Sequence, residues 1–284
     1  MAVGPRPVLG DRRRLALAFA LGAVLAVLAT LGSVRLLRAD RGDQSVLVGD
    51  YSTCRPAGPA PGGATRQPPP PLPPRPAGAE RPAWIARPAG DQQILSTASL
   101  VLPVTSAVTD GHALVVSLML TSTCPGPVTV TDSRGNAYRT LADVTDGRRH
   151  RVLILAAFEV AALGTADSLT LGYPRSSKYH VAVDEFSGIT GAGQAAVASG
   201  DAGGTAFSTE SAPLTCAAGD LQVAAVGTNS GSAPVFSPGW TALPVLPLSS
   251  YRLSTAYRLT DTTARCAATG RTTAQWAAAL ATLR

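Results

Sequence analysis

The 284-residue sequence predicts an all-β protein, with a single β-sandwich of jelly-roll-like rhythm over residues 91–284. Three observations indicate this class. Short runs rich in Val, Leu, Thr and Ala recur without the 3.6-residue period of a helix. Turn residues such as Asp110-Gly111 and Asp146-Gly147 separate these runs. Roughly ten strands in about 190 residues is a usual size for one sandwich or jelly roll.

The expected strands are apolar or β-branched runs bounded by turn residues. In chain order they are Ser99–Val104, Ala113–Thr121, Pro127–Thr131, Arg151–Phe158, Ser168–Tyr173, His180–Phe186, Leu221–Gly227, Ser250–Leu259 and Gln275–Leu283. Residues 191–213 are rich in small side chains, so we expect a long crossover loop there.

Similar phrases recur in the same order at an interval of roughly a hundred residues. The phrase DGHALVV at 110–116 is matched by AGDLQVA at 218–224, and GNAYRTL at 135–141 by GWTAL at 239–243. RVLILAA at 151–157 similarly corresponds to YRLSTAY at 251–257. Either two related halves close one core, or a β-protein simply reuses turn-strand phrases.

An uncharged apolar segment covers residues 15–34, between Arg12–Arg14 and the pair Arg35 and Arg38. Twenty helical residues at about 1.5 Å each span roughly the 30 Å core of a bilayer. We expect an uncleaved transmembrane helix, with residues 1–14 cytoplasmic and the C-terminal domain outside the cell membrane. A secretory signal peptide is the alternative and would make the protein secreted.

Residues 35–90 form a polar and then proline-rich connection, with twelve prolines between positions 55 and 90. Proline fixes φ and removes a backbone donor, so this composition predicts a disordered extracellular stalk. The phrase from Pro70 to Arg75 fits ligands of SH3 domains, but spacer duty outside the cell explains it better.

The net charge of +6 does not indicate nucleic-acid binding, because the positive charge lies outside the expected domain. Residues 1–90 carry 12 basic and 5 acidic side chains, a net of +7, whereas residues 91–284 carry 12 and 13, a net of −1. A binder of phosphates would place its charge on the folded module. Nucleic acid is therefore excluded as a partner.

Four cysteines, Cys54, Cys124, Cys216 and Cys266, suit an exported protein with two disulfides, for which three connectivities exist. Within the suggested second half, Cys216 and Cys266 each lie beside a strand, so we favour their pairing, which leaves Cys54 with Cys124. The second bond would fold the proline-rich segment back as a loop. No Cys-x-x-Cys or Cys/His cluster has zinc spacing, so we expect neither metal nor cofactor.

The sequence contains no recognisable catalytic motif. His112, His150 and His180 are not framed by any motif, and Asp184 and Glu185 are adjacent on a strand, so they point to opposite faces. We therefore expect no enzyme. The alternative, an exported hydrolase of an unrecognised kind, requires a pocket that brings a histidine and a carboxylate within hydrogen-bond reach.

Binding residues are sought among the aromatic side chains, which form the platforms of carbohydrate sites. Tyr138 and Trp240, both in predicted turns, are the candidates. The segment 132–136 presents several oxygens that calcium could use, but Arg134 argues against a cation and favours a structural Asx turn.

Four segments carry a family resemblance: residues 111–116, VTVTDSRGNAY at 128–138, VDEFSGI at 183–189 and the terminal QWAAALATLR. They resemble uncharacterised β-sandwich modules of actinobacterial secreted and cell-surface proteins. The resemblance covers nearly all of residues 92–284 and implies an exported surface module. It carries over no catalytic residue and no ligand.

The sequence thus predicts a membrane-tethered extracellular module that binds or adheres at the cell envelope, with a cell-wall polymer or glycan as the possible ligand. A hydrolase and a purely structural envelope spacer are the alternatives. The oligomeric state does not follow from the sequence.

Overall fold

The computed structural model describes residue 54 and residues 80–94, 97–210, 214–229 and 232–284. Throughout these residues the regular structure is β, and no helix long and apolar enough to cross a membrane occurs among them. The predicted transmembrane segment 15–34 and most of the predicted stalk lie outside the described residues.

The first half of the domain, residues 80–190, contains two antiparallel sheets. The larger sheet has the order β1 (Ala83–Gln93), β8 (Lys178–Ser187), β3 (Ala113–Thr121), β6 (Arg151–Ala157) and β5 (Arg139–Thr145). The smaller sheet has the order β2 (Thr97–Pro103), β7 (Ser168–Ser176) and β4 (Thr129–Asp132).

The second half, residues 191–284, repeats this arrangement. Its larger sheet has the order β14 (Thr241–Ala242), β16 (Tyr251–Leu259), β12 (Leu221–Asn229), β19 (Gln275–Leu283) and β9 (Ala192–Gly200), and β15 (Leu246–Leu248) also pairs with β16. Its small sheets are β10 (Phe207–Ser208), β18 (Thr269–Arg271) and β13 (Val235–Phe236), and the pair β11 (Leu214–Cys216) and β17 (Ala264–Cys266).

Strand for strand, the two halves have the same order, so the internal repeat suggested by the sequence is confirmed. Strands β1, β8, β3 and β6 correspond to β9, β19, β12 and β16, and the paired phrases fall on corresponding strands and turns. Gly111 and Gly219 adopt positive φ in corresponding turns, as do Gly135 and Gly239. These turns need the left-handed conformation that glycine adopts at no steric cost.

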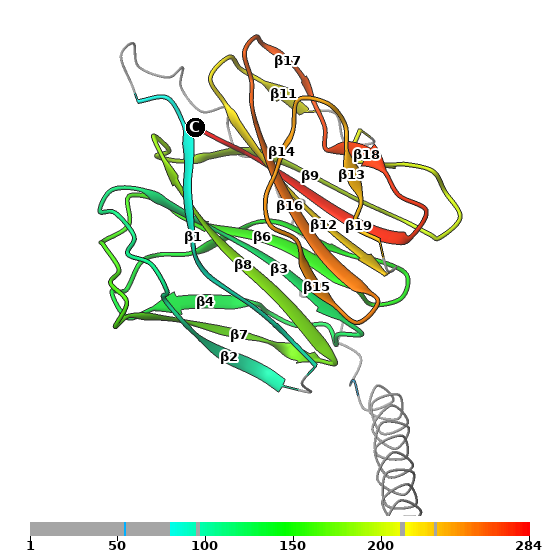
Figure 1. Ribbon diagram of the computed structural model, residues 1–284, viewed down its shortest axis with the longest axis horizontal. Helices are drawn as coiled ribbons and strands as arrows, with labels where there is room; N and C mark the ends of the chain where they lie inside the picture. Colours follow the sequence, from blue (N-terminus) through cyan, green and yellow to red (C-terminus); the bar gives the residue numbers. More distant parts are fainter. Residues whose placement is uncertain (1–53, 55–79, 95–96, 211–213, 230–231) are drawn as a thin grey trace, which may run out of the picture. The chain divides into compact units, whose positions relative to one another are not determined.

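The all-β prediction is confirmed, and the several sheets are consistent with the predicted β-sandwich, although the buried residues divide among three clusters and not one. The two larger sheets face each other, and the smaller sheets cover their outer sides (Figure 1). Buried apolar residues form three clusters: one within each half and a central one between the larger sheets. Strand β3 is buried along its whole length because its side chains alternate between the first-half core and the central core.

The two halves fill their own cores differently, which explains why their sequences are only weakly alike. On the strands of the larger sheet, Leu114, Leu120 and Leu153 of the first half correspond by pairing register to Gln222, Thr228 and Ser254 of the second. Large rings occupy the space opposite these smaller or polar side chains: Phe207, Phe236, Trp240 and Trp276. Packing density is preserved with different residues.

Two segments differ from expectation. The predicted crossover loop at 191–213 contains edge strand β9, whose small residues let it lie close to β19; at Gly200, a Cβ would come 2.7 Å from Nε1 of Trp276. Strand β1 begins at Ala83, so the folded domain reaches into the segment assigned to the stalk. Its Trp84 packs against the central core, and the Trp84 Nε1–H donates to Asp184 at 3.1 Å.

Arg87 of β1 ties the two halves together. Its guanidinium donates two hydrogen bonds of 3.0 Å to the carboxylate of Asp184 in the first half. It also donates to the hydroxyl of Thr255 at 2.9 Å and to the carbonyl of Pro244 at 2.6 Å, both in the second half. A buried ion pair therefore lies at the junction of the halves.

Candidate functional site

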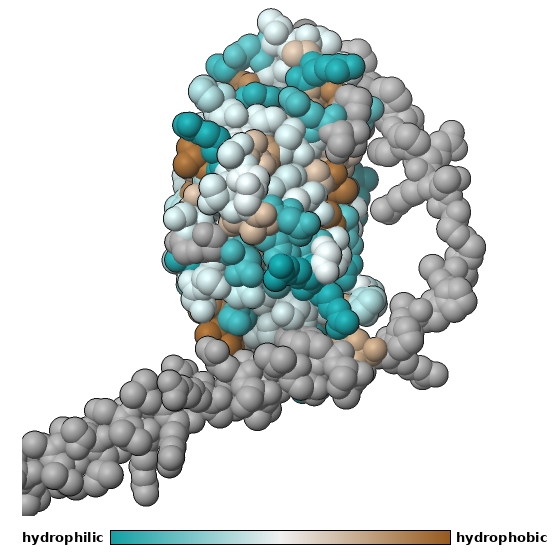
Figure 2. All heavy atoms as spheres, turned by 90° about the vertical axis from the view of Figure 1, so that its right-hand side faces the viewer, coloured by the Kyte–Doolittle hydropathy of each residue, from teal (hydrophilic) through white to brown (hydrophobic). Residues whose placement is uncertain are grey.

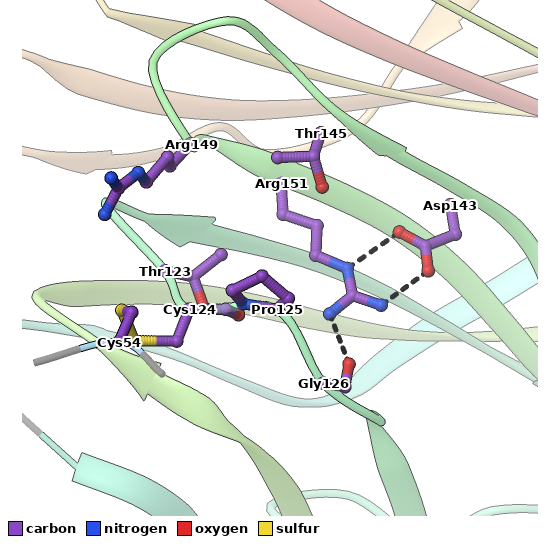
Figure 3. A pocket seen from close by; sticks show the side chains of 9 residues that line it. All are labelled: Cys54, Thr123, Cys124, Pro125, Gly126, Asp143, Thr145, Arg149 and Arg151. Atoms are coloured by element: carbon purple, nitrogen blue, oxygen red, sulfur yellow. Dashed lines mark hydrogen bonds and ion pairs between the residues drawn. A yellow bond between two sulfur atoms is a disulfide. The ribbon is translucent and has the colours of Figure 1, made fainter. Parts of the chain in front are cut away.

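A pocket of about 630 Å³ lies where the end of β3 meets the hairpin that joins β5 to β6 (Figure 3). Its lining comes from residue 54, the segment after β3, and the two strands of the hairpin with their turn. The lining residues are Cys54, Thr123, Cys124, Pro125, Gly126, Asp143, Thr145, Arg149 and Arg151. Its volume lies within the usual range for sites that bind small molecules.

One wall of the pocket is a disulfide. Cys54 is bonded to Cys124, with the two Cα atoms 5.6 Å apart, and Cys216 is bonded to Cys266 across 5.9 Å. Both predicted pairings are confirmed. Because the first bond fixes residue 54 to the domain, the chain between the predicted membrane segment and the pocket is residues 35–53. The proline-rich segment is joined to the domain at both ends and does not set that distance.

A second wall is held by an ion pair. Arg151 donates from Nε and Nη2 to the two carboxylate oxygens of Asp143, at 2.8 and 2.6 Å, and from Nη1 to the carbonyl of Gly126 at 2.7 Å. Three hydrogen bonds in fixed directions leave the guanidinium little freedom. Arg151 thereby connects the hairpin to the loop after Cys124.

Two non-glycine residues beside the pocket have the left-handed backbone conformation, Ser122 with a φ of 47° and Arg149 with a φ of 63°. The carbonyl of Arg149 accepts the N–H of Thr123 at 2.9 Å, which joins the two strained segments. Such conformations cost about 1–3 kcal/mol each and cluster at functional sites.

The layer behind the hairpin is buried and polar. Asp146 accepts the backbone N–H groups of Arg148 and His150, and its other oxygen accepts Nε2–H of Gln275 from the second half. Burial lowers the pKa of His150; nearby Arg148 and Lys178 act in the same direction, whereas Asp146 opposes them. The hairpin is thus seated firmly on the second half.

Tyr138, one of the two predicted binding residues, lies outside this pocket and is half-buried against the first-half core. Its hydroxyl donates to Oδ2 of Asp132 at 2.9 Å, and burial beside that carboxylate raises its pKa. The same Asp132 accepts the backbone N–H groups of Arg134 and Asn136. Segment 132–136 is therefore an Asx turn, as favoured over a calcium site.

Trp240, the other predicted binding residue, packs at the edge of the second-half core, so the structure does not bring it together with Tyr138. Its ring lies 5.7 Å from that of Phe236, and the guanidinium of Arg258 lies 5.0 Å from its centroid. Its buried Nε1 has no hydrogen-bond partner among the described residues. A binding role for either aromatic residue stays a prediction.

A histidine and a carboxylate do meet, but away from the pocket. His112 Nδ1 lies 2.6 Å from Oε1 of Glu185, which also accepts the backbone N–H of Thr109. The corresponding turn of the second half is tied by Asp220, which pairs with Arg284 at 2.6 Å. A side-chain pair thus ties the same turn in both halves, His112 with Glu185 in the first and Asp220 with Arg284 in the second. Asp184 points to the other face, as predicted, and binds Arg87.

Sequence reasoning missed Arg149 and Arg151 as pocket residues. The signal that could have found them is the basic phrase Arg148-Arg-His-Arg151, which directly follows the turn residues Asp146-Gly147. Within the described part of the chain, no group of three or more His, Cys, Asp or Glu side chains could hold a metal ion.

The surface offers no broad apolar alternative in the view of Figure 2, where the brown apolar atoms form separate small spots. The large apolar side chains that are exposed, such as Val101 and Val235, come from different sheets. The pocket is therefore the candidate site. Comparison of the chain with protein-family models, curated proteins and solved structures gave no match.

Proposed function

We propose that this chain is an exported module of the cell envelope that binds a ligand in the pocket beside the Cys54–Cys124 disulfide. The observation that carries the proposal is the construction of this pocket. It has the volume of a ligand site, and a covalent bond and a three-bonded arginine hold its walls. Rigid walls reduce the entropy that is lost on binding.

Two disulfides support export, because such bonds persist in oxidising compartments. Residues 15–34 serve in this proposal as the membrane anchor, and a secreted form results if they are cleaved. Binding is favoured over hydrolysis because the described lining residues include no histidine, and the one carboxylate among them is held by Arg151. The resemblance to actinobacterial surface modules fits the same role.

Filling the pocket tests this function without breaking the disulfide. We expect the full chain, solubilised in a neutral detergent, to sediment with purified actinobacterial cell walls. Replacing Thr145, an exposed lining residue at the end of β5, by Trp should lower the retained fraction at least severalfold. The matched control is Thr241→Trp, on the corresponding edge strand of the second half, which should leave retention unchanged.

Absence of wild-type retention would contradict a wall-binding function and favour an envelope spacer. Equal retention of wild type and Thr145→Trp would contradict the pocket as the site. In that case Trp240→Ala, tested in the same assay, decides whether the predicted aromatic site binds a glycan instead.

A further inference from the structure

Two arginines, Arg149 and Arg151, line the pocket, and three further basic residues lie on the segments that adjoin it. Arg148, Arg149 and Arg151 come from the β5–β6 hairpin, and Arg175 and Lys178 come from the corner between β7 and β8. Backbone hydrogen bonds place Thr123 and Cys124 between these two segments. The N–H of Thr123 donates to the carbonyl of Arg149, and the N–H of Cys124 donates to the carbonyl of Arg175. These two segments carry five of the 12 basic residues that follow residue 90.

The two acids of the hairpin are already engaged. Asp143 is bound through both oxygens by Arg151, and buried Asp146 accepts two backbone N–H groups and the amide of Gln275. The guanidinium of exposed Arg149 has no hydrogen-bond or ion-pair partner among the residues that the structure describes. This cation lines the pocket with its donors available.

The turn does not need an arginine at this position. The hairpin joining β15 to β16 corresponds to the β5–β6 hairpin, and its left-handed residue is Ser249, with a φ of 55°. The same backbone geometry therefore forms without a cation. Arg149 lines the pocket in the same left-handed conformation, so an arginine at this position adds a cation that the turn geometry does not require.

We propose that the pocket binds a phosphate ester, with Arg149 as the direct ligand of the anionic group and Arg151 as a fixed cationic wall. Figure 3 shows the two guanidinium groups pointing to different sides from one hairpin, Arg149 free of drawn contacts and Arg151 held by Asp143 and Gly126. Arginine matches phosphate through parallel N–H donors. The volume of about 630 Å³ leaves room for the group esterified to the phosphate.

This inference rests on the proposed function, because it names the ligand class of the same pocket. Both a phosphodiester polymer of the wall and a phospholipid headgroup carry this chemistry. If residues 15–34 anchor the chain, 19 residues of sequence, 35–53, separate the anchor from Cys54.

Calorimetric titration of the full chain in neutral detergent micelles with glycerol phosphate tests the proposal. We expect saturable binding that weakens with added NaCl, and roughly a tenfold loss of affinity in Arg149→Ser. Serine is the residue of the corresponding turn, so this variant should fold, and an unchanged Tm checks that. Arg149→Lys, which keeps the charge but loses the fork, should fall between the two.

The control is Arg265→Ser, which removes an exposed arginine next to the other disulfide and should leave affinity unchanged. Micelles doped with phosphatidylglycerol distinguish the sources. If phosphatidylglycerol weakens glycerol phosphate binding in wild type but not in Arg149→Ser, the lipid headgroup is the source of the phosphate ester. If phosphatidylglycerol has no effect, the wall polymer is the source. Glycerol phosphate binding supports the ligand class in both cases.

Absence of glycerol phosphate binding, or equal affinity in wild type and Arg149→Ser, would overturn the inference. If cell walls still retain wild type but not Thr145→Trp, the proposed function survives and only the ligand class is wrong. If wall retention is also absent, the proposed function fails with it.

Discussion

Replacing Arg87 by Met is expected to lower the free energy of unfolding by about 3–5 kcal/mol, because it leaves a buried carboxylate without its partner. The side chain of Asp184 is 3% exposed, and that of Arg87 is 13% exposed. Burial raises the pKa of Asp184, and Arg87 opposes this shift, so the carboxyl group should take up a proton more readily once Arg87 is removed. The difference in unfolding free energy between wild type and Arg87→Met should therefore become smaller as the pH falls.

Arg151→Met is the matched control for stability. Arg151 binds Asp143 in the same two-oxygen geometry, but the Asp143 side chain is 34% exposed, so we expect a loss of no more than about 1 kcal/mol from this pair. Urea unfolding of both variants measures the difference. Equal losses would show that burial of the ion pair at the junction does not decide its contribution.

A second large effect is expected from His180, whose ring is buried and whose two nitrogens lack hydrogen-bond partners in the described structure. Burial lowers its pKa from 6.5 to about 4, with Arg252 and Lys178 adding to the shift. Between pH 6.5 and about 4, His180 is therefore protonated in the unfolded chain but neutral in the folded chain. Stability should be unaffected above pH 6.5 and fall by up to about 3 kcal/mol as the pH drops toward 4.

His180→Leu isolates this contribution from that of the other titrating groups. We expect the drop in unfolding free energy between pH 7 and pH 4.5 to be smaller in the variant by about 2–3 kcal/mol. Urea titrations at the two pH values provide the comparison. An identical drop in the variant and wild type would mean that His180 becomes protonated in the folded state.

The strands with strong apolar patterns were predictable from the sequence. Strands β3 and β19 begin and end where the sequence places them, because both are central strands with unbroken runs of apolar or small residues. Strands β1 and β9 were missed because their prolines, glycines and alanines carry a weak strand signal, and both lie at sheet edges, where pairing on one side suffices.

The number of layers was harder to predict than the strands. The central core depends on Ala277, Ala279 and Ala281 of β19, which face the first half across the junction. Alanines in a strand do not reveal that both faces are buried, so the pattern fits one sandwich as well as two stacked ones. The internal repeat is detectable in the sequence because corresponding turns of the two halves both contain glycine, at Gly111 and Gly219 and at Gly135 and Gly239.

The candidate site was only partly predictable. Cysteine count and position favoured the pairing of Cys54 with Cys124, but no local pattern shows that this bond stands beside Arg149 and Arg151. The sequence predicts Tyr138 as an aromatic binding residue in a turn, yet its hydroxyl donates to Asp132 six residues earlier. Contacts between residues far apart in the sequence decide which turn side chains are held in hydrogen bonds and which remain available to bind a ligand.

The bond that fixes residue 54 to the first half forms one wall of the proposed binding pocket, and peptide mapping without reduction tests it directly. Cleavage after Lys and Arg separates the four cysteines into four peptides. Mass spectrometry should find the peptide of Cys54 linked to that of Cys124, and the peptide of Cys216 linked to that of Cys266. A free Cys54, or its linkage to Cys216 or Cys266, would contradict the pocket and the binding role built on it.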